Sequence, residues 1–75
     1  MRLTDIEIGT WVIVLGFEGG FKFQDRLLQH GIYPGDKARI LRAAPLEGPL
    51  LVEVSGREMA LGRAVAQQIM VELMA

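Results

Sequence analysis

The chain has 75 residues, no Cys and a formal net charge of −1, with eight Lys and Arg against nine Asp and Glu. This length allows a single domain over 1–75. The lack of Cys excludes a disulfide framework, a thiolate metal site and a Cys nucleophile, and the near-neutral charge disfavours a general nucleic-acid binder. Apolar residues make up 51% of the chain and nine Gly come in addition, whereas typical domains reach about 45–50% with Gly included. Either the core is unusually apolar or some apolar surface is reserved for a partner.

The first segment predicts a helical turn followed by a strand. Thr4 with Glu7 three residues later has the form of a capping box, which predicts one short turn over 4–8. The β-branched and aromatic residues of 10–17 predict a strand. Its side chains are apolar on both faces from Trp11 to Leu15, so we expect it to be covered on both sides or to run through the centre of the fold.

Residues 21–30 switch to the spacing of a helix. Phe23 and Leu27 lie four positions apart, which predicts the face that packs on the core. Phe21 and Leu28 lie two turns apart on a neighbouring stripe.

The segment after this helix is punctuated by Gly and Pro. Gly31 stands where a left-handed C-cap residue belongs, so the helix is predicted to end at His30. Pro34 and Gly35 suit the two central positions of a type II turn.

The second half of the chain alternates between apolar and polar positions, which is typical of half-buried strands. Ser55-Gly56 is a two-residue link of the kind that tight hairpins use, and residues 62–68 allow one further helical turn. The predicted strands cover residues 37–42, 50–54, 57–61 and 69–73. Five short strands with one helix predict a mainly β fold, a closed or nearly closed small barrel, because closure removes exposed strand edges.

Few residues are candidates for a catalytic or metal-binding role. His30 is the single His and is a weak candidate for a metal ligand, but a metal site needs three or four convergent ligands and no second His or Cys exists. We therefore interpret His30 as a helix-end residue that complements the helix dipole. The carboxylates are scattered, and Ser55, the single Ser, has no plausible base beside it. We expect no enzyme, no cofactor and no catalytic residue.

The location of the protein follows from two further patterns. No apolar run approaches the roughly 20 residues that a membrane span needs. The first nine residues, MRLTDIEIG, do not have the form of a signal peptide. We expect a cytoplasmic protein.

Charge is distributed unevenly along the chain. Residues 1–20 carry −2, residues 21–45 carry +3 and residues 46–75 carry −2. The basic middle segment could contact RNA or an acidic protein surface. RNA-binding barrels interleave basic residues with exposed aromatics, and the candidates here are only Phe21 and Tyr33. We favour a solvated face, with a small RNA-binding barrel as an alternative.

The residues from Arg26 to Asp36, RLLQHGIYPGD, resemble the FeoA family of small bacterial proteins. The family pattern is R-L-x-x-(L/M)-G-(L/I)-x-P-G, and His30 stands where it usually has Leu or Met. The other matching segments are 3–14, the loop 44–49 and 53–64. The resemblance implies an SH3-like barrel of about five strands with an inserted helix. It also implies a cytoplasmic accessory role for FeoB, the membrane Fe(II) transporter with a GTP-binding domain.

The resemblance and the apolar excess together predict a non-enzymatic module that docks on the cytoplasmic part of such a transporter. We expect the contact to use the helix, the turn after it and the loop around Leu46, with two arginines setting the orientation because rim charges steer encounter. The alternative partner is DNA, through an iron-dependent repressor in which a similar barrel is the regulatory domain. Weak self-association stays open. The predicted partner-binding residues are Phe21, Arg26, Leu28, Tyr33, Arg39 and Leu46.

Overall fold

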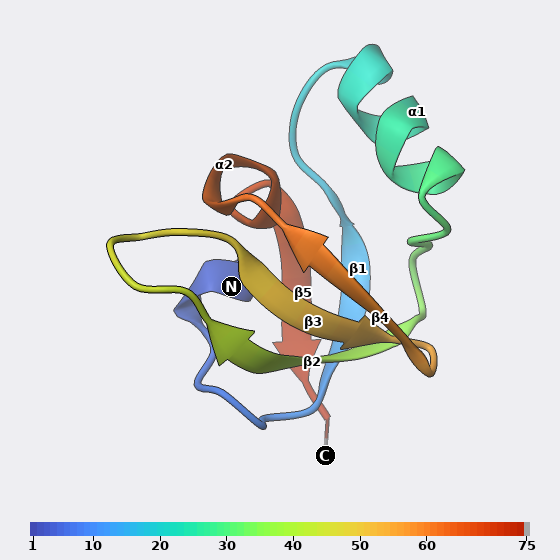
Figure 1. Ribbon diagram of the computed structural model, residues 1–75. Coiled ribbons are helices and arrows are strands. Elements are labelled where there is room, and N and C mark those ends of the chain that lie inside the picture. Colours follow the sequence, from blue (N-terminus) through green and yellow to red (C-terminus); the bar gives the residue numbers. More distant parts are fainter. Residues whose placement is uncertain (75) are drawn as a thin grey trace.

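The alternating apolar positions of the sequence form one strongly curled sheet with two helices beside it (Figure 1). The computed structural model describes residues 1–74. The elements in chain order are a 3-10 turn Leu3–Asp5, β1 Val12–Phe17, α1 Phe21–Gln29, β2 Lys37–Ala43, β3 Leu50–Val54, β4 Arg57–Leu61, α2 Arg63–Ala66 and β5 Ile69–Leu73. The predicted order of a strand, a helix and four strands is confirmed, with the short C-terminal turn between the last two.

The strands pair antiparallel in the order β4-β3-β2-β1-β5. Within residues 1–74 the ladder ends at β4 and β5, so the sheet is the nearly closed form of the predicted barrel rather than a continuous ring. The N-terminus covers the outer edge of β5, because the Val71 N–H donates a 2.8 Å hydrogen bond to the Met1 carbonyl and Arg2 forms a bridge with Met70. This edge is thereby shielded from other strands.

Strand β1 occupies the position that its apolar sequence predicted, between β2 and β5. Val12 and Val14 point inward and are 0% and 2% exposed. The opposite face is not covered, since Leu15 is 50% exposed. The prediction that this strand runs through the centre of the fold is confirmed. The alternative, that it is covered on both faces, is wrong.

The core lies inside the curl of the sheet. The alternating strand residues that fill it are Val12, Val14, Ala38, Ile40, Leu50, Val52, Val54, Leu61, Ile69 and Val71. Met59 and the helical Phe23 are only half-buried against it, and Leu73 at the end of β5 is 54% exposed. Four apolar residues outside the strands complete it and were not predicted. They are Leu3, Ile6, Ile32 and Ala66.

The N-terminal turn differs from its prediction. It spans Leu3–Asp5 rather than 4–8, its N-cap residue is Arg2, and the capping carboxylate comes from Asp5 at the third position of the turn. The Asp5 carboxylate accepts a 2.9 Å hydrogen bond from the Arg2 backbone N–H, and Asp5 donates its own N–H to the Arg2 carbonyl at 2.9 Å. The predicted box of Thr4 and Glu7 is wrong because this reciprocal pair starts the turn earlier.

The Gly positions around α1 behave as predicted. Gly31 has φ +82°, which ends the helix in the left-handed conformation. Gly35 has φ +96°, and the Asp36 N–H donates to the Tyr33 carbonyl at 3.1 Å, which closes the predicted turn.

Candidate interaction surface

Helix α1 stands to one side of the sheet (Figure 1). Leu27 is its only fully buried side chain, at 1% exposure, and Phe23 packs half-buried against the core. The flank that carries Phe21 and Leu28 faces solvent, with exposures of 85% and 38%. Because these two residues are seven positions apart, they lie on the same stripe of the helix. The sequence predicted this apolar stripe, and its exposure is confirmed.

Tyr33 follows the helix in the loop that leads to β2 and is 51% exposed. Its backbone N–H donates a 2.8 Å hydrogen bond to the Asp36 carboxylate. In the same loop, the Gly35 N–H donates to the Val14 carbonyl at 2.7 Å. The loop is therefore tied to β1, and Tyr33 lies within five residues of Leu28 on a braced segment.

Leu46 is separated from these residues. It is 98% exposed in the loop between β2 and β3, which lies on the opposite side of the molecule from α1 (Figure 1). Leu46 and Glu47 both have positive φ, +58° and +57°, a conformation that is unfavourable for residues with a side chain. The loop is braced by the Arg63 Nε–H, which donates to the Gly48 carbonyl at 3.1 Å. Phe21 and Leu28 thus share one stripe of α1 and Tyr33 follows that helix by a few residues, whereas the loop of Leu46 lies on the opposite side of the molecule (Figure 1).

Arg39 has partners inside the chain. On the outer face of the sheet its guanidinium lies 4.5 Å from the centroid of the Trp11 ring. It also donates two hydrogen bonds to one carboxylate oxygen of Glu53, at 3.1 and 2.9 Å. Arg39 pairs with Glu53 in the register of β2 and β3, and Trp11 immediately precedes β1, whose first residue Val12 is opposite Ala38. The sequence analysis predicted that Arg39 contacts a partner, and in the structure its guanidinium contacts these two residues of the same chain.

Arg26 lies on the other flank of α1 from Phe21 and Leu28, because it follows Phe21 by five positions. Its side chain is exposed, as is that of Lys22 one turn earlier. The ion pairs found within residues 1–74 are Arg2–Glu18 and Arg39–Glu53. Lys22 and Arg26 therefore belong to no ion pair in that part of the chain.

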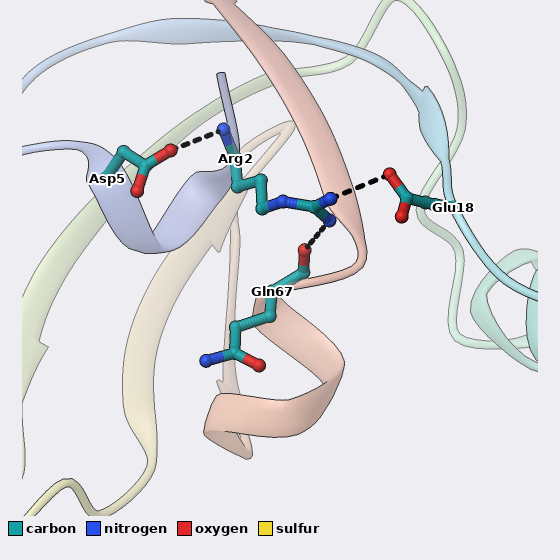
Figure 2. A network of polar contacts seen from close by, with 4 residues as sticks. All are labelled: Arg2, Asp5, Glu18 and Gln67. Carbon is teal, nitrogen blue, oxygen red and sulfur yellow. Dashed lines mark hydrogen bonds and ion pairs between the residues drawn. The ribbon is translucent and has the colours of Figure 1, made fainter.

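Three other arginines connect segments that are distant in the sequence, and sequence reasoning missed them. Arg2 donates to the Gln67 carbonyl at 2.7 Å and to the Glu18 carboxylate at 2.8 Å (Figure 2). Arg57 donates to the Gly31 carbonyl at 2.8 Å, and Arg63 makes the bond to Gly48 described above. Each targets a loop carbonyl that no periodic pattern identifies.

The predicted weak metal candidate, His30, is exposed at the C-cap of α1. Across residues 1–74, His, Cys, Asp and Glu side chains form no group of three or more that could hold a metal ion. In the same part of the chain, no helix has the length and apolar character needed to cross a bilayer.

Comparison with known proteins gives a consistent set of relatives. The model of the FeoA domain matches residues 1–73. A protein of Methanocaldococcus jannaschii named putative Fe(2+) transport protein A is 36% identical over 64 residues, which cover 85% of this chain and 76% of that protein. A Porphyromonas gingivalis protein named as a fusion of Fe(2+) transport protein A with the Fe(2+) transporter FeoB is 30% identical over 73 residues. The match covers 97% of this chain but 9% of the fusion protein.

A solved structure gives the same result for the fold. The crystal structure of FeoA from Stenotrophomonas maltophilia, a complex with zinc, is described as an SH3 domain protein. It superposes with a TM-score of 0.80 at 25% identity, and the match covers 96% of this chain and 89% of that chain. The predicted SH3-like fold is confirmed.

Proposed function

Since this chain belongs to the FeoA domain family, we propose that it is a cytoplasmic, non-enzymatic accessory protein of ferrous-iron uptake, which binds the cytoplasmic GTP-binding part of a FeoB-type Fe(II) transporter. The contact is made by the exposed flank of α1 with Phe21 and Leu28, continued by Tyr33. Fe(II) is the cargo of the partner in this account and not a group held by this chain.

The fusion in Porphyromonas gingivalis supports the choice of partner. Joining two modules in one polypeptide turns their association into an intramolecular step at high effective concentration. Such a fusion suits two proteins that act together on the same transport process.

The surface of α1 supports the choice of contact residues. Exposed aromatic and large aliphatic side chains that lie together are typical of protein interaction sites. Phe21 is 85% exposed although it is a large aromatic, and the helix packs on the core through Leu27 and Phe23, which leaves the flank of Phe21 and Leu28 open to a partner. Leu46 is left out of the contact because its loop lies on the opposite side from α1 (Figure 1).

Co-purification tests the proposal with a matched pair of variants. The tagged chain is mixed with detergent-solubilised transporter, and the bound fraction is compared among wild type, Leu28→Asp and Leu46→Asp. Both variants place a carboxylate at an exposed Leu, so both should fold as the wild type does. We expect Leu28→Asp to lose the transporter and Leu46→Asp to retain it. Equal retention by both variants would refute the surface, and no retention by wild type would refute the partner.

A further inference from the structure

A groove runs between the two helices, on the flank of α1 opposite to Phe21 and Leu28. Its volume is about 370 Å³, and its walls are mostly apolar. Phe23 and Val65 are half-buried, whereas Ala64 is exposed. The residues that line the groove are Gly19, Phe23, Arg26, Ala64, Val65 and Gln68.

The two walls of the groove are fixed to each other. The Glu18 N–H donates a 2.7 Å hydrogen bond to the Gln68 carbonyl, which joins the segment before α1 to the segment after α2. Arg2 bridges the same two segments through the Glu18 carboxylate and the Gln67 carbonyl (Figure 2). A groove held open in this way needs little reorganisation to accept a ligand, which favours binding.

Gly19 shapes one end of the groove. A Cβ atom at this position would lie 3.2 Å from the Phe23 ring, so the absence of a side chain lets the ring rest against the backbone. The φ of Gly19 is +139°, which also favours glycine. Phe23 thereby packs against Gly19 where both residues line the groove.

The charge along the groove is positive. Arg26 lines it, and Lys22 lies one helical turn earlier on the same stripe. Of the nearest acidic groups in the sequence, Glu18 is paired with Arg2 at 2.8 Å. Asp25 keeps its charge, but it follows Phe21 by four positions and so lies on the flank away from the groove, where it accepts a 3.0 Å hydrogen bond from Gln29. An apolar groove beside two cations that are in no ion pair within residues 1–74 is complementary to an apolar group flanked by negative charge.

We propose that this groove binds a short peptide segment in which a bulky apolar side chain is flanked by carboxylates, and, resting on the proposed function, that the segment belongs to the transporter. The apolar side chain covers Phe23, Ala64 and Val65, while the carboxylates pair with Lys22 and Arg26. The volume is at the lower end of the roughly 300–1,000 Å³ that is common for ligand pockets. It therefore suits one or two side chains of an extended segment rather than a folded surface.

Fluorescence anisotropy with a defined probe tests the groove directly. The probe is a short labelled peptide that carries Leu and Phe between Glu residues, and its comparison is the same peptide with every Glu changed to Gln. We expect the Glu peptide to bind the wild-type chain and the Gln peptide to bind at least about tenfold more weakly, because the charge pairing is lost. Equal binding of the two peptides, or no binding of the Glu peptide, would overturn the proposal.

Two matched pairs of variants locate the site. Ala64→Trp fills the groove from an exposed position, and Ala60→Trp makes the same change on the exposed side of β4. Arg26→Glu reverses the charge beside the groove, and Arg42→Glu does so at the far end of β2. We expect Ala64→Trp and Arg26→Glu to bind the Glu peptide about tenfold more weakly or worse. The control variants Ala60→Trp and Arg42→Glu should bind it with the affinity of the wild type. Unaltered binding to Ala64→Trp would place the peptide elsewhere and refute the groove.

The same variants separate this inference from the proposed function. If Leu28→Asp fails to retain the transporter but Ala64→Trp retains it, the groove is refuted as a transporter site and the proposed function is unaffected. Failure of the wild-type chain to retain the transporter, combined with groove-dependent binding of the Glu peptide, refutes the proposed partner and leaves the groove as a peptide site.

Discussion

The guanidinium of Arg57 donates a 2.8 Å hydrogen bond to the backbone carbonyl of Gly31, 26 positions earlier in the chain. The contact joins the start of β4 to the end of α1. It adds a polar contact to the packing of Leu27 and the half-buried Phe23, which attach the helix to the core. The position of the proposed docking flank thus depends on a polar contact as well as on the core.

Gly31→Ala is expected to destabilise the fold more than Gly35→Ala. Both glycines have positive φ, +82° and +96°, so an Ala in either costs about 1–2 kcal/mol. A Cβ at Gly31 would in addition push aside the flexible end of Arg57 and break its exposed hydrogen bond to the Gly31 carbonyl, a further loss of about 0.5–1.5 kcal/mol, whereas at Gly35 it meets open space. Urea denaturation should show this excess in the wild-type background. In an Arg57→Ala background the two substitutions should have the same effect, and an excess that persists there would contradict the explanation.

Leu27→Ala and Leu28→Ala form a pair of adjacent substitutions with opposite expectations. Leu27 is 1% exposed and Leu28 is 38% exposed. Truncation of a buried Leu lowers the free energy of unfolding by about 2–5 kcal/mol, while a surface change stays within about 0.5 kcal/mol. Chemical denaturation measures both values, and hydrogen exchange should show the amides of α1 losing protection only in Leu27→Ala. Similar losses for the two variants would mean that the helix is attached by a different face.

The contact between Arg39 and Trp11 can be measured with a double-mutant cycle. We expect Arg39→Ala and Trp11→Leu to couple by about 0.5–1 kcal/mol, as exposed cation–π pairs do. Trp11 is the only Trp in the chain, so its emission should also change in Arg39→Ala. Arg42→Ala, at the exposed end of the same strand, should leave the emission unchanged. Additive effects with an unaltered emission spectrum would show that the two side chains are independent in solution.

Titration with single-stranded RNA at low salt should show no binding. Of the eight Lys and Arg residues, Arg39 is paired with Glu53, and three others donate to backbone carbonyls within the chain. Those three are Arg2, Arg57 and Arg63. Binding that falls steeply with salt would instead indicate phosphate contacts and favour an RNA-binding barrel.

The order of the elements and most of the core could be predicted because they depend on local patterns. The alternation over 50–54 and the Gly-Pro punctuation after α1 each specify one conformation with little influence from the rest of the chain. Leu3, Ile6, Ile32 and Ala66 were missed as core residues. Leu3, Ile6 and Ile32 lie in a short turn and in loops, and Ala66 lies in the four-residue helix α2. These segments are too short for a period to assign a side chain to the inside, and their burial depends on how distant segments pack.

The interaction surface was predictable only in part, since it depends on which residues meet in space. The apolar stripe of Phe21 and Leu28 follows from helical spacing. Whether Leu46 lies beside it depends on the course of the sheet, which places that loop on the opposite side (Figure 1). Arg39 was predicted to contact a partner. Its contacts with Trp11 and Glu53 depend on how neighbouring segments of the sheet are placed beside one another, which the sequence pattern alone does not reveal. The groove between α1 and α2 likewise exists only once both helices are placed.

The central claim is that this chain binds the GTP-binding part of its transporter through the outer flank of α1. Isothermal titration calorimetry with the isolated cytoplasmic domain of the transporter tests it most directly. We expect wild type and Leu46→Asp to bind with the same affinity, in the micromolar range of about 1 µM or weaker that small transient interfaces give, and Leu28→Asp to give no measurable heat of binding. Wild-type affinity in Leu28→Asp, or the absence of binding by the wild-type chain, would contradict the claim.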